Sequence, residues 1–259
     1  MERLNRHAWI GSAGLFVLIL LVAGCAAGTS LKNLPAVEPA GTLPENIVLE
    51  EVGADVFKVR PPTGRILSMT KDNITVQIVY WRRADLDRKY NRGNAFSPFY
   101  ETEALHQGDK TDVFYVKVTN NAATPVVYRV KGTRQVPCEM IDQGENRYGS
   151  LNYNSLKERL TYMSRASGIY VTNGLRKARE ILIETQLLDT EKGIPPGESI
   201  EGFLPFYQMK HNAETLTVII PLELKPPEDT ATRYKRIVYE FPFVHHKGIR
   251  LAQPAPHRY

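Results

Sequence analysis

A polar segment at about residues 84–110 holds the residue types that come closest to a ligand site. Asp85 and Asp87 are carboxylates separated by one residue, and a cation or sugar-phosphate site could use both, although such sites normally need more oxygen ligands. The segment is also aromatic, with Tyr90, Phe99 and Tyr100 following the carboxylates. It lacks the twelve-residue calcium-loop pattern, so a solvated loop is the expected structure. We still expect function here first, because binding residues often lie on loops held by a rigid scaffold.

The histidines show no spacing typical of a metal site. No His-x-x-x-His, Cys-x-x-Cys or His-Glu-x-x-His pattern occurs. His245 and His246 end a predicted strand, where adjacent residues point to opposite faces of a sheet. The sequence therefore predicts surface histidines and no metal. The alternative is a site built from His211 and one of the pair.

Motifs for catalysis are sparse. The chain has no Gly-x-Ser-x-Gly elbow, Walker-type loop or dinucleotide-binding glycine pattern. Cys138 has no histidine within several residues, so a buried, inert thiol is expected; a reactive thiol or an intermolecular disulfide is the alternative. Paired carboxylates of the glycosidase type stay open, because sequence does not show their separation in space. We predict no catalytic residue and no cofactor, and leave enzyme activity open.

The elements that must position these residues are mostly β-strands. Clean alternation of apolar and polar residues predicts four strands, at 74–80, 114–118, 216–224 and 237–243. Weaker candidates are 48–59, 64–69, 125–131, 134–141 and 198–206. One apolar face on each strand indicates sheets packed face to face. Pro205, Pro221 and Pro242 lie inside strands; since proline cannot donate to a ladder, these strands are predicted to be edges or to carry bulges.

Residues 150–192 break the β pattern and predict a helical insertion. Ser155 and Glu158 have capping-box spacing, with apolar residues at helical intervals after them: Leu156, Leu160 and Met163. A second helix is predicted at about 175–188. Its apolar stripe would hold Leu175, Ala178, Leu182 and Thr185.

The first 24 residues have the order of a secretory signal peptide. Arg3 and Arg6 precede an apolar run of about 13 residues, shorter than the ~20 of a membrane-spanning helix, the alternative. Val22-Ala23-Gly24-Cys25 resembles the lipobox of bacterial lipoproteins. The resemblance implies a lipidated Cys25 as mature N-terminus, and two or more acyl chains would hold it stably in a membrane. Ala26 in place of Asp implies, by the same resemblance, the outer membrane, on its periplasmic face.

The predicted organisation follows from this signal. Residues 1–24 are the signal peptide, and residues 25–46 are the lipidated cysteine with an Ala-, Gly- and Pro-rich flexible tether. The folded domain is predicted at 47–250, with a C-terminal tail at 251–259. If Cys25 carries lipid, Cys138 has no partner within the chain, and stability must come from the core.

Two turn sequences carry a second resemblance, which covers about residues 70–243. Val118-Thr119-Asn120 ends one strand, and Pro196-Gly197-Glu198-Ser199 precedes the strand that contains Gly202-Phe203-Leu204-Pro205-Phe206. This arrangement resembles the immunoglobulin-like domains of exported bacterial lipoproteins. It implies a mainly β chain: an immunoglobulin-like antiparallel β-sandwich with a small helical insertion. The motifs bring no catalytic residues with them.

The net charge and the predicted location in the cell envelope together favour a binding role. The net charge of +5 is not gathered in a Lys/Arg-rich block, so the sequence predicts no nucleic-acid partner; anionic lipid headgroups or acidic polysaccharide stay open. We expect a non-enzymatic envelope lipoprotein, held in the membrane through lipid on Cys25, that binds an envelope protein or polysaccharide. The alternatives are an envelope hydrolase with a site near 84–110, and a subunit of a secretion or cell-surface assembly that docks through the helical insertion.

Overall fold

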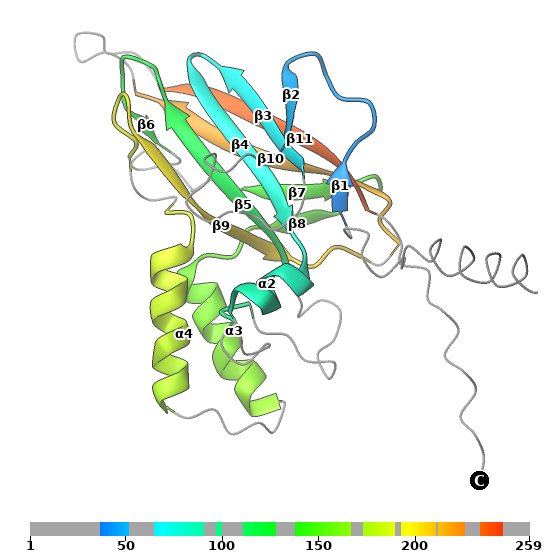
Figure 1. The fold of residues 1–259 in the computed structure, drawn as a ribbon, viewed down its shortest axis with the longest axis vertical. Helices are drawn as coiled ribbons and strands as arrows, with labels where there is room; N and C mark the ends of the chain where they lie inside the picture. The colour runs from blue at the N-terminus through cyan, green and yellow to red at the C-terminus, as the bar shows by residue number, and fades with distance from the viewer. Residues whose placement is uncertain are drawn as a thin grey trace, which may run out of the picture. The chain divides into compact units, whose positions relative to one another are not determined.

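The computed structural model describes residues 37–51, 65–90, 97–99, 111–127, 138–166, 173–189, 193–210, 212–225 and 234–245. The predictions for the signal peptide, Cys25, Tyr100, His211, His246 and the tail fall outside these residues. Within them, the strands form two antiparallel sheets, as Figure 1 shows. The prediction of a mainly β sandwich is confirmed.

Sheet A has the strand order β1-β11-β10-β7-β8, and β6 also pairs with β10. Its strands are β1 (Val37–Pro39), β6 (Val126–Val127), β7 (Glu139–Asp142), β8 (Arg147–Gly149), β10 (Thr215–Leu224) and β11 (Lys235–His245). Sheet B has the order β2-β3-β4-β5-β9. Its strands are β2 (Ile47–Glu51), β3 (Arg65–Lys71), β4 (Ile74–Trp81), β5 (Thr111–Asn120) and β9 (Ser199–Tyr207).

The main core lies between the two sheets and consists of the apolar residues that alternate along each strand. The inward faces of β4, β5, β10 and β11 are buried in one cluster, which confirms the four predicted strands. Tyr239 of β11 joins the two sheets, because its Oη donates to the carbonyl oxygens of Ile74 at 2.8 Å and Lys71 at 3.1 Å. The apolar burial of this core supplies the main stabilisation of the sandwich.

The two turn sequences noted above lie side by side. β5 pairs with β9, and Thr119 faces Ser199 in the register. Asn120 is fully buried behind this pair: its Nδ2 donates to the carbonyl oxygens of Thr124 and Ile194, both at 2.9 Å. Its Oδ1 accepts from the amide of Ala122. A buried amide with its donors and acceptor in use fixes the loop after β5 to the turn before β9.

The helices are α2 (Arg83–Lys89), α3 (Tyr153–Ala166) and α4 (Asn173–Gln186). The capping box predicted at Ser155 is wrong, because Asn152 is the N-cap: its Oδ1 accepts from the amide of Ser155 at 2.9 Å. The stripe predicted for the second helix is also displaced. Arg179 and Ile183 are its buried residues, whereas Thr185 is exposed.

A second core covers the outer face of sheet B. On the sheet it consists of Ile66, Val79, Trp81, Val113, Tyr115 and Phe203. Opposite them lie Leu86 of α2, Phe99, Leu151, Leu156 and Leu160 of α3, and Ile183 of α4. We call this cluster the cap core, and we call residues 82–90, 153–166 and 173–186 the helical cap. The helices of the predicted insertion therefore pack on outward-facing residues of sheet B, and Figure 1 shows them gathered at the lower end of the sandwich.

The strand β9 is an edge strand, as predicted from Pro205, and its free side is partly covered. The amide of Leu188 donates to the carbonyl of Phe203 at 2.9 Å, and the amide of Leu151 donates to that of Pro205 at 2.8 Å. These contacts fix the C-terminal end of α4 and the N-terminal end of α3 to one strand. They also remove backbone groups that an exposed edge would present to another chain.

The edge prediction is wrong for β10 and β11, which are interior strands. β7 pairs with β10 only up to Ile219 and β6 only from Glu223, so Pro221 lies where that side of β10 needs no donor. Pro242 lies just beyond the pairing with β1, and its carbonyl accepts from the amide of Ala40. Proline is tolerated inside these strands because the neighbouring strands are short.

Some elements lie outside the predicted ranges. Val37–Pro39, which the sequence pattern assigned to the tether, forms β1 and pairs with β11, and Val37 is buried. The three-residue strand β8 was not predicted. β3 and β4 are joined by Asp72 and Asn73 with positive φ of 52° and 60°, a conformation that Asp and Asn adopt more readily than other non-glycine residues.

Gly202 tests the docking of the helical cap on β9. A Cβ at this position would overlap the backbone of Leu188 and lie 2.6 Å from the carbonyl carbon of Leu187. We expect Gly202→Ala to lower the free energy of unfolding by about 1–3 kcal/mol, as overpacking does. Urea unfolding followed by circular dichroism measures the change.

Gly149→Ala is the matched control, because a Cβ there meets nothing within 4 Å. It should leave stability unchanged or slightly raised. Equal effects of the two variants would mean that the backbone of α4 does not approach β9 this closely.

Candidate functional site: the helical cap

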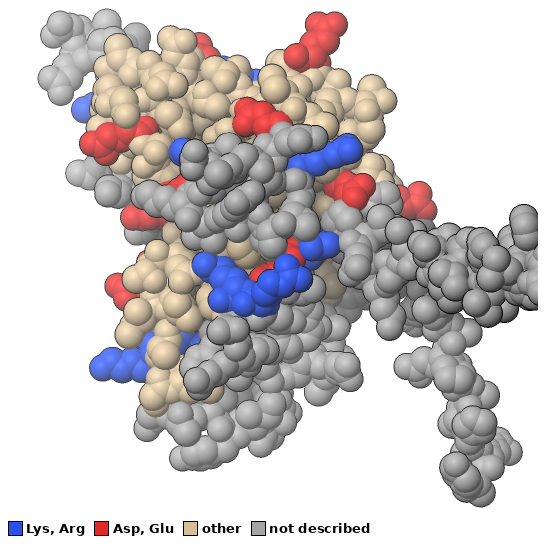
Figure 2. Space-filling view, viewed as in Figure 1, with Lys and Arg blue, Asp and Glu red and all other residues tan. Residues whose placement is uncertain are grey.

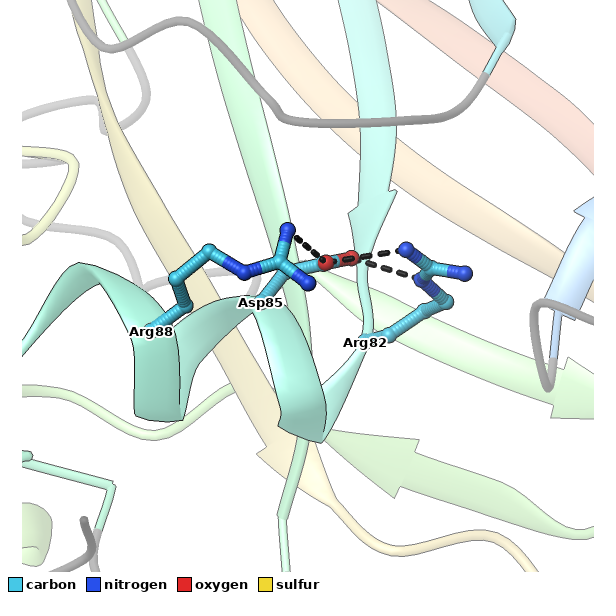
Figure 3. Close-up of polar contacts among 3 residues, drawn as sticks. All are labelled: Arg82, Asp85 and Arg88. Atoms are coloured by element: carbon cyan, nitrogen blue, oxygen red, sulfur yellow. Dashed lines mark hydrogen bonds and ion pairs between the residues drawn. The ribbon is translucent and has the colours of Figure 1, made fainter. Parts of the chain in front are cut away.

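The beginning of α2 is held by one buried carboxylate between two arginines. Asp85 is 1% exposed, and Arg82 donates to both of its oxygens, from Nε at 2.6 Å and from Nη2 at 2.9 Å. Arg88 approaches from the other side, with Nη1 3.8 Å from Oδ1 (Figure 3). The hydrogen bond to Asp85 raises the pKa of Arg82, although burial opposes this. A carboxylate removed from water needs such partners.

This arrangement gives the predicted acidic pair a structural setting. Both oxygens of Asp85 face guanidinium groups, so the residue anchors Arg82 and the first turn of α2. Asp87 lies on the same helix, and its side chain is outside the described part. The predicted loop 84–110 therefore starts with a helix.

The aromatic residues of the predicted binding loop that are described belong to the cap. Tyr90 donates from Oη to Oε1 of Gln186 at 2.7 Å, which joins the end of α2 to the end of α4. Burial raises the pKa of Tyr90. Phe99 is buried and packs edge-on against Phe203, with ring centroids 5.4 Å apart. Tyr100 is outside the described residues.

Phe203 lies at the centre of an aromatic cluster. The rings of Trp81 and Tyr115 approach it edge-on, at centroid distances of 5.1 Å and 4.9 Å. Trp81 is 3% exposed and is part of the cap core. Its Nε1 is buried, and no acceptor for it lies among the residues that the structure describes. The cluster is a packing site, and it determines where the cap sits.

Lys89 extends over this cluster. Its Nζ lies 5.7 Å from the ring centroid of Tyr90 and 5.9 Å from that of Phe203. Burial lowers the pKa of Lys89. The aliphatic stem covers apolar surface while the charge stays at the boundary with solvent, as long cationic side chains commonly do.

The helical cap has more cationic side chains than carboxylates, and two of its carboxylates each face two cations. Glu180 of α4 faces both Lys157 of α3, at 3.8 Å, and Arg176, at 4.0 Å. Asp85 is likewise shared by Arg82 and Arg88. Each of these two carboxylates therefore faces two cations. Arg88 is 69% exposed and Arg176 54%, so much of this charge faces water.

The charge of the chain is concentrated in this region. The helical cap holds ten Lys and Arg against five Asp and Glu, whereas the rest of the chain holds 23 of each kind. The whole net charge of +5 is thus that of the cap. Figure 2 shows the cations over α2 and the lower part of α4, with acidic residues mostly over the sheets on this face. Sequence reasoning missed this gathering, although the spacing of Arg82, Asp85 and Arg88 at intervals of three was a signal for it.

A second polar network, also missed from sequence, lies in the hairpin of β7 and β8. Asp142 accepts from the amides of Gly144 and Asn146, from the side-chain amide of Asn146, and from Tyr148 Oη at 2.7 Å. Burial opposes ionisation of Asp142, but these hydrogen bonds outweigh it and lower its pKa. Burial and the same carboxylate raise the pKa of Tyr148 to about 12. The network has internal partners throughout and stabilises the hairpin.

The other candidates for chemistry have structural surroundings where they are described. Cys138 is buried, as predicted, and burial raises the pKa of its thiol to about 12, which disfavours the reactive thiolate. The Nδ1 of His245 lies 2.8 Å from the carbonyl oxygen of Ala213. Within the described ranges, no three His, Cys, Asp or Glu side chains come together as metal ligands.

The buried apolar residues of the described helices face the sheet. Leu156, Leu160 and Ile183 face the cap core, and Ile181 is the large apolar residue of α4 left half exposed. No broad apolar stripe of the kind that would support docking of an assembly subunit lies on the described faces of α3 and α4. None of the described helices combines the length and apolarity needed to cross a membrane.

Comparison of the chain with protein-family models, with curated proteins and with solved structures finds no match.

Asp85 gives a test of the arginine pairing. We expect Asp85→Asn to lower the free energy of unfolding by about 1–3 kcal/mol, because it leaves Arg82 without its charged acceptor. Thermal and urea unfolding measure the change.

The control is Asp72→Asn, which makes the same chemical change in the exposed pair with Lys235. It should cost less than about 1 kcal/mol. If the two substitutions cost the same, Asp85 is not buried between arginines.

Proposed function

We propose that the chain is a membrane-anchored envelope lipoprotein whose helix-capped sandwich serves as a non-enzymatic binding module for another envelope component. The lipid would be attached to Cys25, and the location would be the outer membrane on its periplasmic face. Support for the lipid attachment and the membrane location comes from the lipobox at 22–25 and from Ala26 after it. Support for the binding role comes from the cap.

The observation that carries the binding role is the concentration of positive charge on the helical cap. The cap core fixes α2, α3 and α4 to a rigid sheet, while the exposed cations, among them Arg88 and Arg176, outnumber the carboxylates beside them. A rigid surface of one charge attracts partners of the opposite charge and orients them. An anionic envelope component is the partner class that such a surface suits.

Fatty-acid labelling tests whether lipid is attached to Cys25. Cells grown with an alkyne fatty acid should label the wild-type chain, whereas Cys25→Ser should abolish the label and shift the protein out of the membrane fraction. Cys138→Ser is the control and should keep both, because that thiol lies in the main core. Label on the Cys25→Ser chain, or its retention in membranes, would contradict the lipobox interpretation.

A further inference from the structure

The chain enters the sandwich at the end that carries the helical cap. β11 begins beside the turn between β3 and β4, where Lys235 pairs with Asp72 and Tyr239 bonds to Ile74. From there β4 runs to Trp81, which α2 follows, and β11 runs to His245 in the facing sheet. Packed sheets keep their strand directions within about 30° of each other. Trp81 and His245 therefore lie at one end of the sandwich.

A chain of contacts across that end supports the placement. Asp112, at the start of β5, accepts from Tyr80 Oη at 3.1 Å and from the amide of Met209 at 2.9 Å. The segment after Met209 leads to Ala213, whose carbonyl oxygen lies 2.8 Å from the Nδ1 of His245. His245 in turn faces Val37, the first residue of β1. The strand that leads back to Cys25 thus begins next to the cap end.

The tether is long enough for the cap to reach the membrane that holds the anchor. Val37 is twelve positions after Cys25, and a fully extended chain of that length spans at most about 43 Å. α3 and α4, each of 14 residues, are about 21 Å long and extend away from β9 (Figure 1). A lipid on Cys25 therefore keeps the cap within reach of the membrane surface.

We propose that the helical cap docks on the anionic phospholipid headgroups of the membrane that holds the lipid anchor. This inference rests on the proposed lipoprotein function and names its partner. The cap presents exposed cations, among them Arg88, Arg176 and Lys177, and an anionic surface attracts such groups. An acyl anchor combined with a basic surface is a physically sufficient pair of membrane signals.

Fluorescence quenching in vesicles tests the docking on the full lipidated chain. Gly174→Cys places a probe at the beginning of α4, where an added Cβ meets nothing within 4 Å. Glu198→Cys places the control probe in the exposed turn before β9, at the opposite end of the sandwich from Tyr207 and Thr111. Cys138 is buried and should not label. The vesicles contain headgroup-nitroxide lipid with either phosphatidylglycerol or phosphatidylcholine.

The probe at 174 should be quenched on phosphatidylglycerol vesicles, and the probe at 198 should not. Quenching should disappear on phosphatidylcholine vesicles and in 1 M salt, where the screening length falls to about 3 Å. The triple variant Arg88→Gln, Arg176→Gln, Lys177→Gln should lower the docked fraction by at least about tenfold, since each cation near an anionic surface is worth on the order of fivefold. Lys225→Gln, Lys235→Gln, Arg236→Gln, at the far end, should change nothing.

Flotation of the same vesicles separates the two proposals. Protein that floats but is quenched equally at 174 and 198, or equally on both lipids, overturns the docking while the lipid anchor stands. Release of the cap by polygalacturonate, with no dependence on lipid charge, overturns it in favour of an acidic polysaccharide. Protein that fails to float overturns the lipoprotein proposal and the docking together.

Discussion

The outer face of sheet B imposes the constraint on which the rest of this structure depends. Trp81, Tyr115 and Phe203 lie on a face that an ordinary sandwich would leave to solvent, and burying large aromatic side chains is strongly favourable. The helical cap covers them, and Gly202 lets the backbone at Leu187 and Leu188 come close enough to pair with β9. This contact fixes the helices, which also pack against one another, to the sandwich.

The same packing determines where the charge is. Because α2 follows β4 directly, Arg82 and Asp85 begin the helix at the margin of the cap core, and Arg88 and Lys89 reach its rim. The carboxylates Asp85 and Glu180 each face two cations and hold them in place on the cap. The sandwich is the rigid scaffold, and the cap carries the excess of positive charge. The cap lies at the end of the sandwich where β1 begins.

Alternating strands and the two turn sequences were predictable because they reflect local rules: one apolar face for each strand, and Asn, Pro and Gly in turns. The helix at Asp85 was not predictable from the residues next to it in the sequence. Residues 83–89 form an ion-paired helix because they pack on the outer face of sheet B, which is a tertiary contact. The stripe of the second helix was displaced for the same reason, since tertiary packing selected Ile183 and Arg179. β1 and β8 have three residues each, too few for periodicity to detect.

Amide hydrogen exchange tests most directly whether cap and sandwich form one cooperative unit. The amides of Leu151 and Leu188 donate to β9, so their exchange reports the attachment of α3 and α4. The account predicts that both exchange only with global unfolding, as slowly as the amides of Val116 in β5 and Val218 in β10. Exchange of Leu151 and Leu188 orders of magnitude faster than these core amides would contradict it, because the cap would then open independently of the sandwich.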